Sequence, residues 1–257
     1  MSAGIVLDLD GVVYRGSAAV PGAAEGLSAL ADAGFELHFV TNNSARAPGA
    51  VAERIASIVG YPARPDQIVT SSLVAASMIE EGPVLMMGES GLEVAIRAAG
   101  FETTEDPNAA RTVVVGLDRN LSYERAAAAA DAARAGARLI VTNRDPTFPI
   151  EDGGLKPGAG ACAALVETAA GVVGETAGKP SAAMRRLVER RIPEGTIWMV
   201  GDRPDTDIAL AAAERWKSIL VLTGVTSDPT TVDPAPDFVA ADLKAAADII
   251  LAAEAEG

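Results

Sequence analysis

Two carboxylates follow a short apolar run near the N-terminus. In the segment GIVLDLDGVVYRG, residues 4–16, Asp8 comes directly after Ile5, Val6 and Leu7, which have the composition of a buried strand, and Asp10 follows two positions later. Burying one carboxylate is costly, and two like charges side by side raise that cost. Side chains along an extended strand alternate between its faces, so both carboxylates point the same way if the strand continues. A compensating group is therefore expected beside them.

Other polar side chains follow predicted strands or precede a predicted helix. They are Thr41 and Asn42 after one strand, Asp202, Asp205 and Asp207 after another, and Lys179 before a helix in GKPS. Taken singly, each has an ordinary explanation as a turn former, a helix cap or a solvated charge. In an open parallel sheet, however, ligands bind at the carboxyl ends of the strands. We therefore expect these segments to converge on one crevice.

Acidic side chains gathered in one crevice need a cation among them. Two unit charges about 4 Å apart repel by roughly 4 kcal/mol at an effective dielectric near 20. Mg²⁺ removes this repulsion because it prefers oxygen ligands, and it leaves positions for water and phosphate oxygens. Such a site suits attack on a phosphate ester. Asp8 is the candidate nucleophile that forms an aspartyl phosphate, Asp10 the general acid and base, and Gly11 lets the loop turn over the phosphate.

Apolar runs alternate with helical patterns along the chain, which predicts βαβ units and a mostly parallel sheet. Gly34 ends the first predicted helix and Pro48 begins the second. The second half repeats the alternation, with a strand at 196–202, a helix over 206–217 and a strand at 218–224. Between the halves, further strands are predicted in the segments PVLMMG, TVVVGLD and ARLIVTN. The expected fold is a doubly wound α/β core with an inserted α/β domain.

The segments DLDGVVYRG, VTNNS, GKPS and VGDRPDTDIALA together resemble the four motifs of the haloacid dehalogenase-like (HAD) phosphatases. Their arrangement is similar to the NagD-like branch, which includes p-nitrophenyl phosphatases and phosphoglycolate phosphatases. The likeness runs over nearly the whole chain. It implies a Rossmann-like catalytic core of residues 1–76 and 178–257, with an α/β cap of residues 77–177 inserted between the second and third motifs.

The resemblance also implies a role for each motif residue. It makes Asp8 the nucleophile and a Mg²⁺ ligand, Asp10 the acid and base with its backbone carbonyl on the metal, and Asp202 a further ligand. The remaining implied site residues are Thr41, Asn42 and Gly11 for phosphate, Lys179 for the charge on nucleophile and phosphoryl group, and Asp207 and Asn43 in support. Pro204 lies in the metal loop, where many members carry an aliphatic residue, and this puts the loop geometry in question.

Charge and cysteine content narrow the classes of partner and compartment. Thirty-five acidic against 21 basic side chains give a formal net charge of −14, which argues against nucleic acid as a partner. Cys162 is the only cysteine, so no intrachain disulfide can form. We interpret its side chain as a small buried hydrophobic group. No long uncharged apolar window and no leader-like N-terminus are present, so we expect a cytoplasmic protein without a membrane span.

Substrate choice must come from outside the four motifs. The loop TNRDPTFPIEDGGLKPGAG offers Arg144, Asp145 and Lys156 as candidate contacts to the leaving group, although the same charges also fit a solvated loop. The Thr-Asn pair at 142–143 repeats the pair at 41–42 and is interpreted as a turn former. The resemblance implies that the substrate is a small phosphorylated metabolite such as 2-phosphoglycolate, glycerol phosphate, a sugar phosphate or a nucleoside monophosphate. Members of this branch can pair through their caps, so the resemblance also suggests a homodimer of this chain.

Two other functions fit the same fold. A dehalogenase shares the fold and the nucleophile, but it needs neither Asp10 nor the acidic loop at 202–207. A catalytically silent module that binds a phosphate ligand would be expected to lack the nucleophile or a metal ligand, and both are present in the sequence. His38 is interpreted as structural, because it lies in the middle of a predicted strand and the proposed chemistry needs no histidine.

Overall fold

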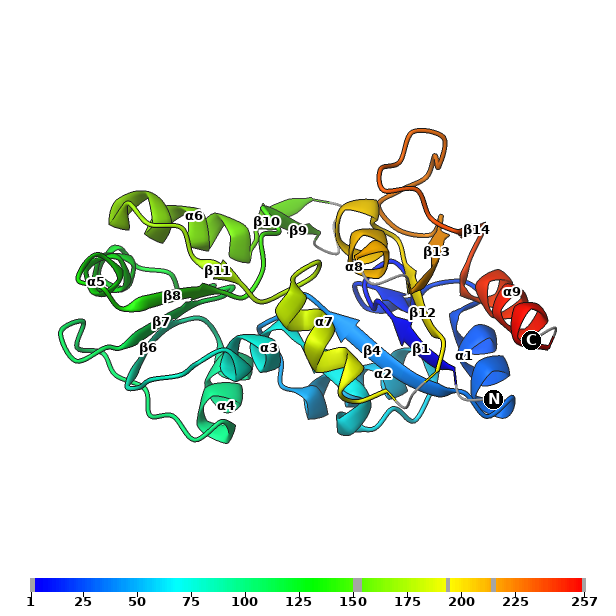
Figure 1. The fold of residues 1–257 in the computed structure, drawn as a ribbon, viewed down its shortest axis with the longest axis horizontal. Helices are drawn as coiled ribbons and strands as arrows, with labels where there is room; N and C mark the ends of the chain where they lie inside the picture. Colours follow the sequence, from blue (N-terminus) through cyan, green and yellow to red (C-terminus); the bar gives the residue numbers. More distant parts are fainter. Residues whose placement is uncertain (1–2, 150–153, 193–194, 214–215, 256–257) are drawn as a thin grey trace. The chain divides into compact units, whose positions relative to one another are not determined.

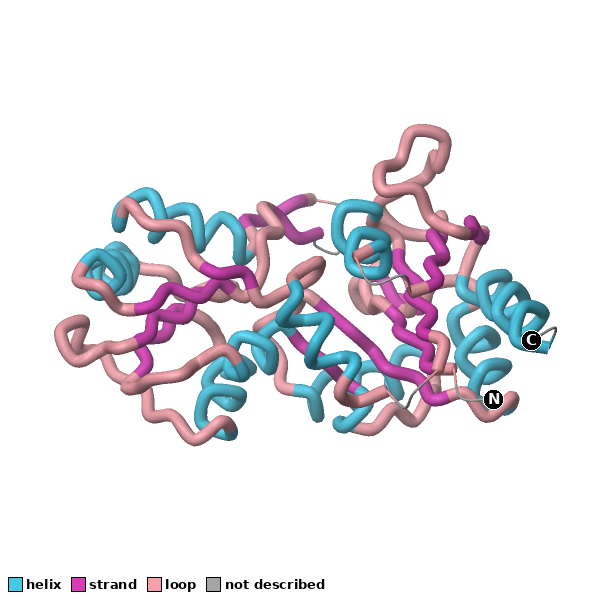
Figure 2. The backbone as a smooth tube through the Cα atoms, viewed as in Figure 1, coloured by secondary structure: helices cyan, strands magenta, loops and turns pink. Residues whose placement is uncertain are grey.

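The computed structural model describes residues 3–149, 154–192, 195–213 and 216–255. The chain forms two compact units, and neither is continuous in sequence. The first unit comprises residues 1–41, 49–69 and 185–257, and the second comprises residues 42–48 and 70–184. Each contains a sheet and helices (Figure 2), which confirms the predicted α/β class. The predicted catalytic core and cap are assignments of role, and their boundaries stay predictions.

The first unit is built on a sheet with the strand order β14-β13-β12-β1-β4-β5. The strands are β1 Gly4–Leu7, β4 Glu36–Thr41, β5 Ile68–Thr70, β12 Ile197–Gly201, β13 Lys217–Val221 and β14 Phe238–Ala240. β1 pairs in parallel with both β4 and β12, and β13 pairs in parallel with β12 and β14. The chain winds to one side of β1 through β4 and to the other through β12. The carboxyl end of β1 is thus a topological switch point, where α/β sheets bind ligands.

Helices bury the apolar faces of this sheet. α1 and α9 pack side by side (Figure 1), and Leu27, Leu243 and Ile250 are fully buried with Trp198 of β12. The helices that belong wholly or partly to this unit are α1 Ala23–Asp32, α2 Pro48–Val59, α7 Ala182–Glu189, α8 Ala209–Ala212 and α9 Leu243–Ala255, with a 3₁₀ turn at Pro65–Gln67. A short hairpin, β2 Tyr14–Arg15 with β3 Ala18–Ala19, follows the first motif.

The helix predicted over 206–217 is much shorter in the structure. A π-helical turn, η2 Pro204–Ile208, leads into α8, which ends at Ala212. The amides of Asp207 and Ile208 both donate to the Arg203 carbonyl, at 2.9 and 3.3 Å, which widens the turn. Alanine-rich composition alone favoured one long helix, and these local bonds override it. Pro204 begins the turn, where a missing N–H is tolerated.

The second unit has a smaller sheet of order β11-β8-β7-β6, in which β8 pairs in parallel with β11 and β7, and β7 pairs in parallel with β6. Its strands β6 Val84–Met87, β7 Thr112–Val115 and β8 Arg138–Val141 confirm the three predicted here, and β11 is Glu175–Thr176. Its helices are α3 Ser71–Ser77, α4 Ser90–Ala98, α5 Tyr123–Arg134 and α6 Ala159–Ala170, and β9 Thr147–Pro149 pairs antiparallel with β10 Leu155–Pro157. The small side chains of α5 and α6, including buried Cys162, form this unit's core with β7 and β8.

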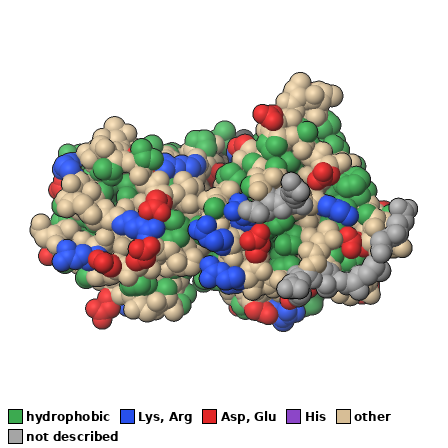
Figure 3. Space-filling view, viewed as in Figure 1, with side chains coloured by type: hydrophobic (Ala, Val, Ile, Leu, Met, Phe, Trp, Pro, Cys, Tyr) green, Lys and Arg blue, Asp and Glu red, His purple; other side chains and the backbone are tan. Residues whose placement is uncertain are grey.

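Charges of both signs share the surface. On the face drawn in Figure 3, basic side chains are interspersed with acidic ones. In the second unit, for example, Arg138 pairs with Glu175 at 2.7 Å and with Glu80 at 2.9 Å. In the described part of the chain, every helix is too short or too polar to cross a membrane.

His38 of β4 gives a prediction for the pH dependence of stability. His38 is 2% exposed, and its ring nitrogens have no hydrogen-bond partner among the described residues. Burial lowers the pKa of His38, with a smaller opposing effect of the Glu36 charge. The unfolded chain therefore takes up a proton as the pH falls below about 6.5, whereas the folded chain does so only at lower pH. Stability should be full above that pH and fall below it, by up to about 1.4 kcal/mol per pH unit.

Urea unfolding of the native protein and of His38→Leu between pH 5 and 8 tests this prediction. Leucine removes the titrating ring, so the variant should lose this part of the slope. An equal slope in both proteins would assign the acid sensitivity to other groups.

Candidate active site

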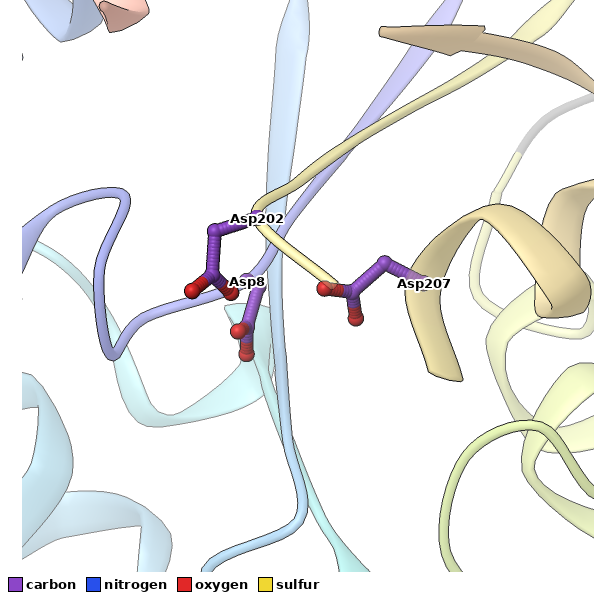
Figure 4. Close-up of side chains that lie close together, drawn as sticks. All are labelled: Asp8, Asp202 and Asp207. Carbon is purple, nitrogen blue, oxygen red and sulfur yellow. The ribbon is translucent and has the colours of Figure 1, made fainter. Parts of the chain in front are cut away.

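Three carboxylates meet at the carboxyl end of the central strand. Asp8 follows β1, Asp202 follows β12 and Asp207 lies in η2, and one oxygen of each falls within 4.8 Å of the others (Figure 4). Asp8 and Asp202 are neighbours because β1 and β12 are paired in parallel, with the Asp8 N–H donating to the Val200 carbonyl at 2.9 Å. The three residues are 7%, 2% and 0% exposed, respectively. We call them the acidic trio.

Backbone amides orient two members of the acidic trio. The Val225 N–H donates to Oδ2 of Asp202 at 2.6 Å, and the Arg203 N–H donates to Oδ2 of Asp207 at 3.1 Å. The loop after β13 also reaches the first motif, because the Thr223 hydroxyl donates to the Gly11 carbonyl at 2.7 Å. Sequence reasoning missed this loop. Its segment LTGVTSD carries only the turn signals of any loop that follows a strand.

The acidic trio fits a hard divalent cation. Its donors are all carboxylate oxygens, the ligand type that Mg²⁺ and Ca²⁺ prefer, with no thiolate or imidazole in the set. Three acidic groups so close repel one another, and a bound cation relieves that repulsion. The site therefore has the composition and spacing of a metal centre.

Gly11 gives a test of how tightly the loops surround Asp202. Gly11 has φ of +87°, and a Cβ there would lie 2.6 Å from Asp202 Oδ2. Gly34 has φ of +85° but only open space around its would-be Cβ, so it is a matched control. Both alanine variants should lose about 1 to 2 kcal/mol of stability from the left-handed backbone. Only Gly11→Ala should also displace Asp202 and weaken Mg²⁺ binding, measured by titration calorimetry. Equal Mg²⁺ affinity in the two variants would contradict this arrangement.

Asp10 is placed differently from the expectation that it shares a strand face with Asp8. β1 ends at Leu7, so the alternation of strand side chains does not extend to these residues. Asp10 is exposed and forms a β-bridge with Tyr14, and it lies outside the acidic trio. Burial raises the pKa of Tyr14, and the charges of Asp10 and then Asp8 add to the effect. The charges of both carboxylates thus raise the pKa of the same phenol, that of Tyr14.

Thr41 and the residues after it fall on either side of the division between units. Thr41 ends β4 in the first unit and is 3% exposed. In the second unit, Asn43 Oδ1 accepts from the backbone amides of Ala45 at 2.9 Å and Arg46 at 3.3 Å, which makes it a turn former. Lys179 lies in the same unit and is 3% exposed. Its N–H donates to Asn42 Oδ1 at 2.7 Å.

Two of the cap candidates are held by contacts inside the second unit. The Arg144 guanidinium donates to Thr176 Oγ1 at 2.9 Å, to Glu167 Oε2 at 2.6 Å and to the Gly174 carbonyl at 2.7 Å. These bonds favour a structural role for Arg144, one that neither sequence interpretation included. Asp145 Oδ2 accepts from the Asn42 amide at 3.2 Å. Lys156 is exposed on β10. Residues 150–153 of the same loop lie outside the described residues.

Comparison with known proteins agrees with the motifs. A profile for haloacid dehalogenase-like hydrolases matches residues 5–102, and a HAD-hydrolase-like profile matches residues 176–246. Chronophin from Bos taurus is 38% identical over 243 residues, covering 87% of this chain and 82% of the relative. The structure of p-nitrophenyl phosphatase from Archaeoglobus fulgidus gives a TM-score of 0.89 at 31% identity, covering 96% of this chain and 99% of that one. The structure of glycerol phosphate phosphatase from Mycobacterium tuberculosis in complex with magnesium gives a TM-score of 0.85 at 34% identity, covering 95% of this chain and 75% of that one. The chain belongs to the haloacid dehalogenase-like hydrolases.

Proposed function

We propose that this protein is a Mg²⁺-dependent phosphomonoesterase that hydrolyses small phosphorylated metabolites through an aspartyl phosphate on Asp8. The observation that carries the proposal is the acidic trio at the switch point of the sheet. The phosphatases among the similar proteins support the same reaction class, and one of them was solved with magnesium. Candidate substrates are 2-phosphoglycolate, glycerol phosphate, sugar phosphates and nucleoside monophosphates.

The proposed reaction has two steps, and both are in-line displacements at phosphorus. In the first, a carboxylate oxygen of Asp8 attacks phosphorus, the bond to the ester oxygen breaks, and Asp10 protonates the departing alkoxide. In the second, Asp10 takes a proton from water, which attacks the aspartyl phosphate and releases inorganic phosphate and Asp8. The acidic trio would hold a Mg²⁺ ion, whose positive charge would offset the repulsion among the three carboxylates and stabilise negative charge on the phosphoryl oxygens.

The remaining motif residues bind the phosphoryl group in this proposal. The Thr41 hydroxyl and the backbone that follows it donate to phosphate oxygens, and the Lys179 ammonium balances their charge. A local cation is needed because a protein with a net charge of −14 repels small anions. Lys156 is the cap residue we assign to the leaving group, since the Arg144 guanidinium is already bonded to three acceptors of the protein.

Release of inorganic phosphate from a panel of small phosphomonoesters, with p-nitrophenyl phosphate included, tests the proposal. We expect turnover with Mg²⁺, none after treatment with EDTA, and recovery when Mg²⁺ is returned. The ranking within the panel would then name the substrate class. A protein that binds Mg²⁺ and phosphate esters but releases no phosphate would instead be a binding module. Release of halide from a 2-haloacid without added metal would identify a dehalogenase.

A further inference from the structure

The repeated Thr-Asn pair has a second role beyond turn formation. Asn143 Oδ1 accepts from the Asp145 N–H at 3.0 Å, which confirms the predicted turn. The amide nitrogen of the same side chain donates to the Asn42 carbonyl at 2.7 Å. Asn143 is 4% exposed, so this bond is shielded from water. Asn42 and Asn143, 101 positions apart in sequence and both in the second unit, are therefore held together by one side chain.

Asn42 is held at both its backbone and its side chain. Its carbonyl also accepts from the Ser71 hydroxyl at 2.7 Å, which occupies the second lone pair. Its amide oxygen accepts from the Lys179 N–H at 2.7 Å, and its amide nitrogen donates to Asp145 Oδ2 at 3.2 Å. A flipped amide would set an NH₂ group against the Lys179 N–H and an oxygen against a carboxylate. The orientation of Asn42 is therefore defined by its neighbours.

The backbone before Lys179 packs directly on this network. A Cβ at Gly178 would lie 2.5 Å from Asn42 Oδ1 and 2.6 Å from the Thr142 carbonyl, closer than a side chain allows. Both the Lys179 N–H and the residue before it are thus fixed against Asn42 and Thr142 of the same unit. These contacts fix the position of the Lys179 Cα. They therefore also fix the point from which the buried Lys179 side chain extends.

We propose that Asn143 is a positioning residue for Lys179, acting through Asn42. The proposal rests on the proposed function in one respect, namely that Lys179 acts on the phosphoryl group. Asn143 fixes the Asn42 carbonyl, and Asn42 fixes the Lys179 backbone through its amide oxygen. Small displacements of a group that acts on the reacting atoms reduce rates by about 10²-fold. Loss of the hydrogen bond from Asn143 should therefore displace Lys179 and lower the rate of the reaction.

Asn143→Asp is the informative variant. Its carboxylate keeps an acceptor for the Asp145 N–H, and so keeps the turn, but it replaces the donor to the Asn42 carbonyl with an oxygen. We expect kcat to fall about 10- to 100-fold. In a Lys179→Ala background, followed in single-turnover assays with excess enzyme, the same change should alter the rate by less than about twofold. An equal loss in both backgrounds would overturn the proposal.

A second measurement is independent of activity. Limited acylation of lysines, read by peptide mass spectrometry, should label Lys179 at least about tenfold faster in Asn143→Asp than in the native protein, because local opening exposes buried groups. Exposed Lys244 is the internal control and should not change. Unchanged labelling of Lys179 would refute the positioning role. A native protein inactive on every ester would refute the proposed function instead, and labelling alone would then decide this proposal.

Discussion

Asp8→Asn is expected to reduce kcat for phosphate release by at least about 10⁴-fold, or about 5 kcal/mol of activation free energy. Asparagine keeps the shape of the side chain but cannot form the aspartyl phosphate. The backbone bond from residue 8 to Val200 is unaffected by the change, so the strand pairing should persist. Steady-state release of phosphate from the best ester of the panel, at saturating Mg²⁺, measures the effect.

The matched control for Asp8→Asn is Asp205→Asn. Asp205 lies in the acidic loop, but its carboxylate pairs with Arg203 at 2.7 Å and its side chain is 64% exposed, outside the acidic trio. Its replacement should leave kcat within about twofold, as for other surface changes. If Asp8→Asn keeps more than a few per cent of native activity while remaining folded, Asp8 is not the nucleophile.

Asp202→Asn should change stability in opposite directions with and without metal. Without metal, removing one of three crowded negative charges should raise Tm. With Mg²⁺, the native protein gains about 2.7 kcal/mol at a concentration one hundred times its Kd, whereas the variant should gain little. The asparagine oxygen can still accept from the Val225 N–H, so the loop after β13 keeps its anchor.

Two measurements distinguish these effects: thermal unfolding in EDTA and with added Mg²⁺, and phosphate release across a Mg²⁺ titration. The Mg²⁺ concentration for half-maximal activity should rise at least about tenfold in Asp202→Asn and stay unchanged in Asp205→Asn. A lower Tm in EDTA, together with native Mg²⁺ affinity, would mean that Asp202 serves the fold and not a metal.

Strand positions and motif chemistry predicted much of the candidate site. Asp8 and Asp202 were located because each follows an apolar run, and parallel strands end at one edge of a sheet. The structure brings these two together with Asp207, which the motif comparison had given only a supporting role. Their catalytic roles, and those of Thr41 and Lys179, stay predictions for the variants to decide.

Features that depend on tertiary approach were not predictable from local sequence. Val225 binds Asp202 because the loop after β13 folds over it, and nothing in a Thr-Gly turn specifies that partner. Arg144 was predicted either to contact the leaving group or to be a solvated loop charge, yet its partners lie 23 to 32 positions further along the chain. Likewise, the sequence marked Asn143 only as a turn former, and nothing in it predicted the second bond, to the Asn42 carbonyl 101 positions earlier.

The strand order of the first unit also bears on how the protein is made. β1 lies at the middle of its sheet, but its partner β12 begins only at Ile197. At translation rates of about 5 to 20 residues per second, roughly 10 to 40 s separate the synthesis of these two strands. Through that interval the backbone along one edge of β1 has no native partner, and the side chains of Ile5 and Leu7, fully buried in the finished fold, lack part of their native cover. A nascent chain with this topology is a natural client for chaperones that shield apolar strand edges on the ribosome.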